Sequence, residues 1–358
     1  MCNIAGYVGN RRAAPVLIDM LSKEEGFDAG YYTGIATVHE GKLYMRKVVG
    51  GTKELIKETD AMDLPGNIGI IQGRSRCGDY GGDEKWAHPF LNPEGTFAYL
   101  ANGIISEFFK GVTDNSAQAK RLYENGYEFT SSSDHKDLYF YPSYKEGFNI
   151  HVSELMCFLI DEQKKKGYSD VEAVDRAFCE NPSEVVGLML NKDNPDTITV
   201  GKVNFPMWIG YGDGEMFLAS AAMVFDRSRI RQKQSLPTCS VIEVKKDKVI
   251  IHPFTKPFVR VYDEMPKEKV FKAVVNGLRE GPKTFYPMGA TLNGVEGILS
   301  RDEIYALGMI PPKGIAYEVM DQLQERGCIK IEKEIWPGPG SRPDLKRETF
   351  VVSLIKEP

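Results

Sequence analysis

Cys2 is the residue best suited to nucleophilic chemistry, because it directly follows the initiator methionine. A small second residue allows removal of Met1, which would leave Cys2 with a free α-amine. An α-amine has a pKa of about 7.7–8.0 and a thiol one of about 8.5, so a single residue would supply a nucleophile and a base near neutral pH. The alternative is a cysteine that occupies position 2 by chance, with its thiol buried in the first strand.

Asn102 and Gly103 form a second candidate pair. A side-chain amide can donate a hydrogen bond to a developing oxyanion, and a glycine lets its backbone N–H approach a substrate closely. The pair therefore suits an oxyanion hole. The same dipeptide also favours a type I′ turn, so the two residues alone leave both interpretations open.

Composition excludes several classes of protein. Lys plus Arg is 45 and Asp plus Glu is 50, so the net charge of -5 argues against a general polyanion binder. The five histidines are dispersed, the six cysteines form no CxxC pair, and no GxxxxGK[ST] phosphate loop is present. No apolar run reaches the roughly 18 residues of a membrane span, and the N-terminus does not look like a secretory signal. We expect a cytoplasmic protein with no cofactor, no metal and no membrane contact.

Short strands are predicted to position the candidate residues. Strand patterns at 4–8, 67–72 and 96–100 lie next to Cys2, Arg74 and Asn102. Helical spacing is found at 12–22, 153–165 and 170–179. Further strands are predicted at 34–39, 42–48, 197–200, 207–211, 216–220, 241–244 and 248–252. Strands at both ends with helices between them favour layered α+β packing.

The pattern changes after residue 252. Residues 253–267 are predicted to be a linker, followed by helices at 268–279, 301–307 and 312–326. Strands at 328–334 and 349–355 would flank a Pro/Gly-rich loop at 336–347. Three helices and a two-stranded ribbon predict a winged-helix-like domain over 268–358. Its third helix carries Glu318, Asp321 and Glu325, so we expect a protein-interaction or dimerisation role rather than nucleic-acid binding.

Motifs over residues 2–252 resemble, in order, those of the class II glutamine amidotransferases, and in particular the glutaminase half of glucosamine-6-phosphate synthase. The resembling segments are Cys2–Gly9, Gly69–Arg74, Ala87–Pro89, Ala101–Ile105, Gly126–Phe129 with Ser131 and Asp134, Asp196-Thr197, Pro206, Ile209-Gly210 and Ala219-Ser220. The resemblance implies an N-terminal-nucleophile (Ntn) hydrolase fold, a four-layer αββα sandwich over residues 1–252.

The resemblance also implies a role for each candidate residue. Cys2 would attack the side-chain amide carbon of glutamine, forming a thioester and releasing ammonia, while its α-amine moves the proton. Asn102 and the Gly103 N–H would form the oxyanion hole. Arg74 would bind the glutamine α-carboxylate and Asp134 the α-ammonium. The simpler alternatives are a surface arginine for Arg74 and a loop or helix-cap aspartate for Asp134.

The chain departs from the family pattern near the expected pocket. Asn3 replaces a glycine, Glu25 replaces an arginine, Ala101 replaces a histidine, and residues 75–78 differ throughout. His88, beside Pro89, is expected to be structural rather than catalytic.

An insertion at residues 135–149 is the largest departure. It carries the aromatic residues Tyr139, Phe140, Tyr141, Tyr144 and Phe148. Such a loop would either cover the pocket and select a larger substrate or pack against the core or a neighbouring subunit. If the alignment gap belongs before Ser131, the family's aspartate falls near Val152 and the Asp134 contact is lost.

The sequence therefore predicts a glutamine amidotransferase subunit that hydrolyses glutamine and passes ammonia to a synthase on another chain, because the segment after residue 252 is too short for the synthase part. The alternatives are an Ntn hydrolase of another γ-glutamyl or amino-acid amide, and a non-catalytic regulatory binding module. We expect a homo-oligomer.

Overall fold

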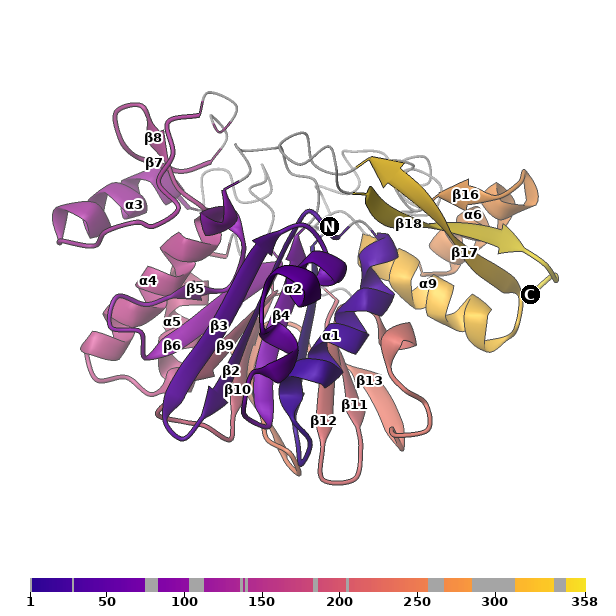
Figure 1. The fold of residues 1–358 in the computed structure, drawn as a ribbon, viewed down its shortest axis with the longest axis horizontal. Coiled ribbons are helices and arrows are strands. Elements are labelled where there is room, and N and C mark those ends of the chain that lie inside the picture. The colour runs from indigo at the N-terminus through magenta and orange to yellow at the C-terminus, as the bar shows by residue number, and fades with distance from the viewer. Residues whose placement is uncertain are drawn as a thin grey trace.

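The structure is a computed structural model, and Figure 1 shows its fold. It describes residues 2–27, 29–74, 83–102, 113–135, 138, 141–182, 186–203, 206–256, 267–284, 313–337 and 346–358.

A seven-stranded antiparallel sheet carries the N-terminus at its centre, in the order β13-β11-β12-β1-β4-β2-β3. Its strands are β1 (Asn3–Val8), β2 (Tyr32–His39), β3 (Lys42–Val49), β4 (Ile68–Arg74), β11 (Trp208–Tyr211), β12 (Met216–Ala219) and β13 (Gln232–Ser235). The hairpin between β2 and β3 turns at Glu40 and Gly41, which have φ angles of 47° and 70°, as a type I′ turn requires.

A six-stranded sheet packs face to face on the first one, in the order β15-β14-β10-β9-β6-β5. Its strands are β5 (Phe90–Leu91), β6 (Phe97–Asn102), β9 (Val186–Asn191), β10 (Ile198–Lys202), β14 (Ser240–Val244) and β15 (Val249–Pro253). Side-chain alternation explains the packing. Along β1, Ile4 and Val8 lie in the core between the sheets, whereas Ala5 and Tyr7 pack in a second core beneath helix α1.

Helices cover the outer faces of both sheets, which gives four layers in the order αββα (Figure 1). Helices α1 (Ala13–Glu24) and α2 (Thr52–Glu58) cover the first sheet, and α4 (Val152–Lys165) and α5 (Asp170–Glu180) cover the second. Helix α3 (Asn115–Glu124) packs beside α4. No described helix is long and apolar enough to cross a membrane.

The described residues 267–284, 313–337 and 346–358 form a further element, here called the C-terminal unit. It contains α6 (Lys267–Arg279), α9 (Lys313–Glu325) and a three-stranded sheet in the order β16-β18-β17. Its strands are β16 (Lys283–Thr284), β17 (Ile329–Pro337) and β18 (Lys346–Leu354). The ribbon of β17 and β18 is longer than the sequence predicts. The predicted helix at 301–307 lies outside the described residues.

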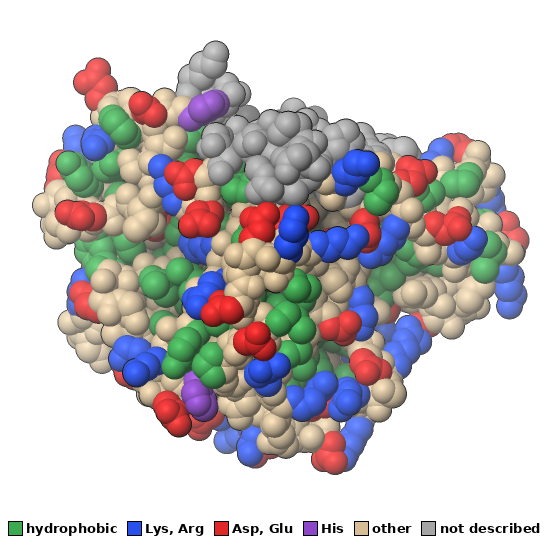
Figure 2. Space-filling view, in the orientation of Figure 1, with side chains coloured by type: hydrophobic (Ala, Val, Ile, Leu, Met, Phe, Trp, Pro, Cys, Tyr) green, Lys and Arg blue, Asp and Glu red, His purple; other side chains and the backbone are tan. Residues whose placement is uncertain are grey.

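The predicted strands and helices agree with the structure elsewhere, but two helices and six strands were not predicted. These are α2, α3, β5, β7 (Ser143–Lys145), β8 (Phe148–Asn149), β9, β16 and the polar edge strand β13. Figure 2 shows Lys and Arg side chains intermingled with Asp and Glu over the visible face, in keeping with the balanced composition.

Candidate active site

Cys2 lies immediately before β1, at the edge where the two sheets face each other. Strand β1 pairs with β4 so that Asn3, which follows Cys2, is opposite Gly73, which precedes Arg74. Residues directly opposite in an antiparallel pair project to the same face. Ile70 lies in the core between the sheets, so Arg74, four residues further along β4, is on the face that is turned toward the second sheet. Cys2 itself is partly exposed.

Asn102 approaches Cys2 from the second sheet. It is the last residue of β6 and is buried. Its Nδ2 donates a hydrogen bond of 2.8 Å to the backbone oxygen of Cys2. The only described non-glycine residues with positive φ are Glu40 and Cys239, so Asn102 does not have the conformation that a type I′ turn needs. Gly103, its predicted partner, lies outside the described residues.

Arg74 is enclosed by the aromatic side chains of Tyr32, Trp86 and Tyr141, here called the Arg74 cage. It is only 2% exposed, and its guanidinium carbon lies 5.5 to 5.9 Å from the ring centroids of Tyr32, Trp86 and Tyr141. Nη1 donates to the backbone oxygen of Trp86 at 3.2 Å, and Nη2 donates to the Tyr141 hydroxyl at 2.5 Å. The interpretation of Arg74 as a surface residue is therefore wrong. Burial holds the planar guanidinium in a fixed orientation beside the strand that follows Cys2.

Two buried histidines lie next to this cage. His88 shares a hydrogen bond of 2.8 Å with the Ser153 hydroxyl, and His151 Nδ1 accepts one of 3.1 Å from the Ser153 N–H. Burial, followed by the charges of Arg74 and Lys47, lowers the pKa of His88 well below its ordinary value. Burial is also the largest cause that lowers the pKa of His151 well below its ordinary value, followed by the charge of Arg74. Both rings are therefore neutral near pH 7, so they add no positive charge beside Arg74.

Asp134 is exposed at the end of a well-anchored loop. Glu154 on α4 accepts hydrogen bonds from the backbone N–H and hydroxyl groups of Thr130 and Ser131, at 2.5 to 2.9 Å. Ser133 and Asn149 form a two-way backbone bridge of 2.9 and 2.8 Å. Val152, the position implied by the other alignment, is a buried apolar residue at the start of α4 and cannot bind an ammonium group.

Two described residues of the insertion at 135–149, Leu138 and Tyr141, pack with Tyr32 and Trp86 of the Arg74 cage. Tyr141 is buried against Trp86 as well as Arg74, with ring centroids 5.1 Å apart. Tyr144 is buried, shares a hydrogen bond of 2.8 Å with the Ser132 hydroxyl and packs against Phe129. The short strands β7 (Ser143–Lys145) and β8 (Phe148–Asn149) form a hairpin. Tyr139 and Phe140 lie outside the described residues.

The sequence did not identify Trp86, Tyr141 and His151 as neighbours of Arg74. An aromatic-rich insertion was a signal that Tyr141 had some role, but nothing in the sequence linked it to Arg74. Among the positions that differ from the family, Ala101 offers its backbone oxygen to Gln72 Nε2 at 2.5 Å. Asn3 is fully buried. Residues 75–78 lie outside the described residues.

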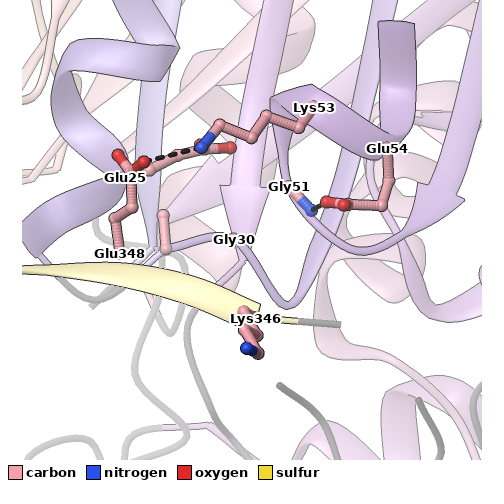
Figure 3. A pocket seen from close by; sticks show the side chains of 8 residues that line it. Glu25, Gly30, Gly51, Lys53, Glu54, Lys346 and Glu348 are labelled. Carbon is pink, nitrogen blue, oxygen red and sulfur yellow. Dashed lines mark hydrogen bonds and ion pairs between the residues drawn. The ribbon is translucent and has the colours of Figure 1, made fainter. Parts of the chain in front are cut away.

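A separate polar pocket lies beside α2 and β18 (Figure 3). Glu25 borders it and accepts hydrogen bonds from the backbone N–H and hydroxyl of Thr52, at 2.5 and 2.9 Å. Neither Cys2 nor Arg74 lines this pocket. Its other lining residues are Ala29, Gly30, Gly51, Lys53, Glu54, Lys346 and Glu348.

The described residues contain no group of His, Cys, Asp and Glu side chains suited to holding a metal ion.

Comparison with known proteins gives sequence relatives for part of the chain. No family model matches it. A glutamine–fructose-6-phosphate aminotransferase (isomerizing) from Pyrococcus horikoshii is 30% identical over 228 residues, which is 63% of this chain and 33% of that protein. The enzyme of the same name from Caldanaerobacter subterraneus is 30% identical over 223 residues, 62% of this chain and 31% of that protein. The chain thus spans about a third of the length of the curated relatives it matches.

Solved structures share the fold. Glutamine phosphoribosylpyrophosphate amidotransferase from B. subtilis, complexed with ADP and GMP, superposes with a TM-score of 0.55 at 14% identity, over 99% of this chain and 72% of that one. A structure described as the allosteric regulatory enzyme of purine biosynthesis has the same TM-score at 16% identity, over 78% of this chain and 58% of that one. The chain is therefore similar to glutamine amidotransferases in sequence and in fold, which confirms the expected resemblance.

Proposed function

We propose that this protein is a glutamine amidotransferase subunit that hydrolyses the side-chain amide of glutamine to glutamate and ammonia. The observation that carries the proposal is the convergence of Cys2, Arg74 and Asn102 at one edge between the two sheets. The similarity to glutamine–fructose-6-phosphate aminotransferases supports glutamine as the substrate.

In the proposed mechanism, removal of Met1 exposes the α-amine of Cys2. The α-amine takes the proton of the Cys2 thiol, and the thiolate attacks the amide carbon to give a tetrahedral intermediate. The α-ammonium returns the proton to the leaving nitrogen, the C–N bond breaks, and ammonia departs to leave the thioester. Water then hydrolyses the thioester to glutamate. The second N–H of the Asn102 amide and the Gly103 N–H stabilise the negative oxygen in each step, because a side-chain amide has two donors.

Two charged residues are proposed to orient the substrate. Arg74 binds the α-carboxylate, and the aromatic cage around it excludes water and strengthens that ion pair. Asp134 binds the α-ammonium. Its exposure allows contact with an incoming substrate, and the anchoring of its loop by Glu154 reduces the entropy lost on binding.

We further propose that a synthase on another chain receives the ammonia and that the protein is a homo-oligomer. The helices and ribbon of the C-terminal unit support its proposed assignment as a winged-helix-like domain.

Ammonia release from glutamine tests the proposed activity. Purified protein of known intact mass is compared with Cys2→Ala and with the matched control Cys179→Ala, whose thiol lies on α5. Loss of release in Cys2→Ala alone supports the proposal. Equal release by all three proteins, or no release from chains that lack Met1, contradicts it.

A second candidate is hydrolysis of a different amide on the same fold. The observation that favours it is the insertion residue Tyr141, which contacts Arg74 where the substrate carboxylate is expected. A panel of γ-glutamyl amides and amino-acid conjugates separates the two functions. Glutamine as clearly the best substrate rules out the second.

A further inference from the structure

The C-terminal unit shares one hydrophobic core with the sandwich. Phe27 in the short helix η1 (Glu25–Phe27) packs between Tyr317 of α9 and Phe350 of β18, with ring centroids 4.7 and 4.8 Å away. Phe27 is 1% exposed, and Ala221 belongs to the same core. A Cβ on Gly26 would lie 2.4 Å from the Phe350 ring, so the backbone of η1 touches the unit directly. The contact is therefore as close as that of a domain interior.

Phe27 is connected to Arg74 by a short piece of chain. Ala29 packs against Gly73, where a Cβ would lie 2.9 Å from the Ala29 methyl group. The Tyr31 N–H donates a hydrogen bond of 3.2 Å to the Arg74 backbone oxygen. Tyr32 then pairs with Arg74 in the sheet. A displacement of Phe27 would therefore be transmitted to the backbone of Arg74 through the contacts of Ala29, Tyr31 and Tyr32.

Ala221 is connected to Cys2 in a similar way. The preceding residue, Ser220, accepts a hydrogen bond of 2.9 Å from the Ile4 N–H through its hydroxyl and donates one of 3.0 Å from its own N–H to the Ile4 oxygen. Ile4 is two residues from Cys2. Glu24 is fully buried and accepts a hydrogen bond of 2.8 Å from the Ala221 N–H, which ties Ala221 to the helix end that leads into η1.

Ion pairs surround this shared core. Lys233 on β13 pairs with Asp321 and with Glu325 of α9, the latter at 2.7 Å, and Arg227 also pairs with Glu325 at 3.4 Å. On the other side, Lys53 and Glu348 pair at 2.6 Å across the polar pocket (Figure 3). The acidic face of α9 thus meets basic residues of this chain.

We propose that the C-terminal unit positions the glutaminase site by fixing the two segments that hold Cys2 and Arg74. Phe350, Phe27 and Asp321 are positioning residues in this arrangement. Release of the unit from the sandwich would then lower activity without any change to a residue that touches glutamine. The proposal rests on the proposed glutaminase function for its kinetic readout only.

The test compares Phe350→Ala with Phe350→Leu and with Ile355→Ala, which changes an exposed residue of the same unit. We expect kcat/KM for glutamine to fall about tenfold or more in Phe350→Ala, because small misplacements of reacting groups have large effects. Phe350→Leu should restore most of it, and Ile355→Ala should equal the wild type. Hydrogen exchange should be faster at residues 3–8 and 29–32 in Phe350→Ala.

Asp321→Asn provides a second variant that leaves the aromatic contact intact and should show a smaller fall in the same direction. If Phe350→Ala does not fold, kcat/KM and hydrogen exchange of Asp321→Asn test the proposal instead. Unchanged kcat/KM, or faster exchange confined to the C-terminal unit, overturns the proposal. If the wild type does not hydrolyse glutamine, the proposed function fails, and exchange at residues 3–8 and 29–32 still decides this inference.

Discussion

The side-chain amide of Asn102 donates a 2.8 Å hydrogen bond to the backbone oxygen of Cys2, and so joins the last residue of β6 in one sheet to the residue that precedes β1 in the other. This bond fixes the backbone of the proposed nucleophile relative to the facing sheet. The bond uses one of the two N–H donors of the amide. The other N–H is the proposed oxyanion donor, and its contribution can be measured as a change in rate.

Asn102→Ala should lower kcat for glutamine hydrolysis by about 10²–10³-fold, since one oxyanion donor contributes that much in enzymes of known mechanism. Asn191→Ala is the matched control. Asn191 is also a strand amide with a buried hydrogen bond, to Asp170 at 2.9 Å, but it pairs with Phe97 at the opposite end of β6. Steady-state kinetics with glutamine check the prediction. Equal kcat values for the two variants would contradict an oxyanion role.

Tyr141→Phe should raise KM for glutamine by about tenfold with little change in kcat, because a hydrogen bond to a charged group contributes about 1.5–3 kcal/mol and Tyr141 orients the Arg74 guanidinium. Tyr144→Phe removes another buried hydroxyl of the same insertion, bound to Ser132 instead. Initial rates over a range of glutamine concentrations separate KM from kcat. A similar KM in both variants would show that Tyr141 does not act through Arg74.

The parts of the site that lie next to regular strands could be predicted from the sequence. Apolar runs predict β1, β4 and β6, and the residues at their ends, Cys2, Arg74 and Asn102, follow from family motifs. The cage around Arg74 could not be predicted, since the position of Tyr141 depends on the path of an insertion across the fold.

Polar and acidic segments were also difficult to interpret from the sequence. Strand β13, Gln232–Ser235, has no apolar alternation because it is a largely exposed edge strand. The acidic residues of α9 argue against binding of nucleic acid. Their pairing with Lys233 depends on tertiary contacts that sequence periodicity does not encode.

Glu154→Ala should lower the melting temperature by about 5–10 °C, because it leaves the N–H and hydroxyl donors of Thr130 and of the buried Ser131 without their acceptor. It should also raise KM for glutamine by loosening the loop that ends at Asp134. Glu162→Ala on the same helix removes a partly exposed partner of Arg121 and should cost about 1 kcal/mol or less. Thermal unfolding by circular dichroism measures both. Equal shifts would mean that the Glu154 bonds do not stabilise the loop.

Glu25→Gln should change how stability depends on pH. Burial raises the pKa of Glu25 from 4.5 to about 7, against the opposing effect of its hydrogen bonds from Thr52. A carboxyl with a raised folded-state pKa binds its proton more tightly in the native protein, so its contribution is complete below pH 4.5 and is lost as pH rises through 7.

The free energy of unfolding of Glu25→Gln, relative to wild type, should therefore increase between pH 4.5 and 7 and level off above that range. One pKa unit corresponds to about 1.4 kcal/mol. Urea unfolding of both proteins at several pH values measures this difference, and the comparison cancels the opposite contributions of His88 and His151, whose pKa values are lowered. Glu54→Gln is the control, because Glu54 caps the same helix through the Gly51 N–H at 2.9 Å. A difference that stays constant with pH would contradict a raised pKa of Glu25. One equally large in Glu54→Gln would show that the pH dependence is not specific to Glu25.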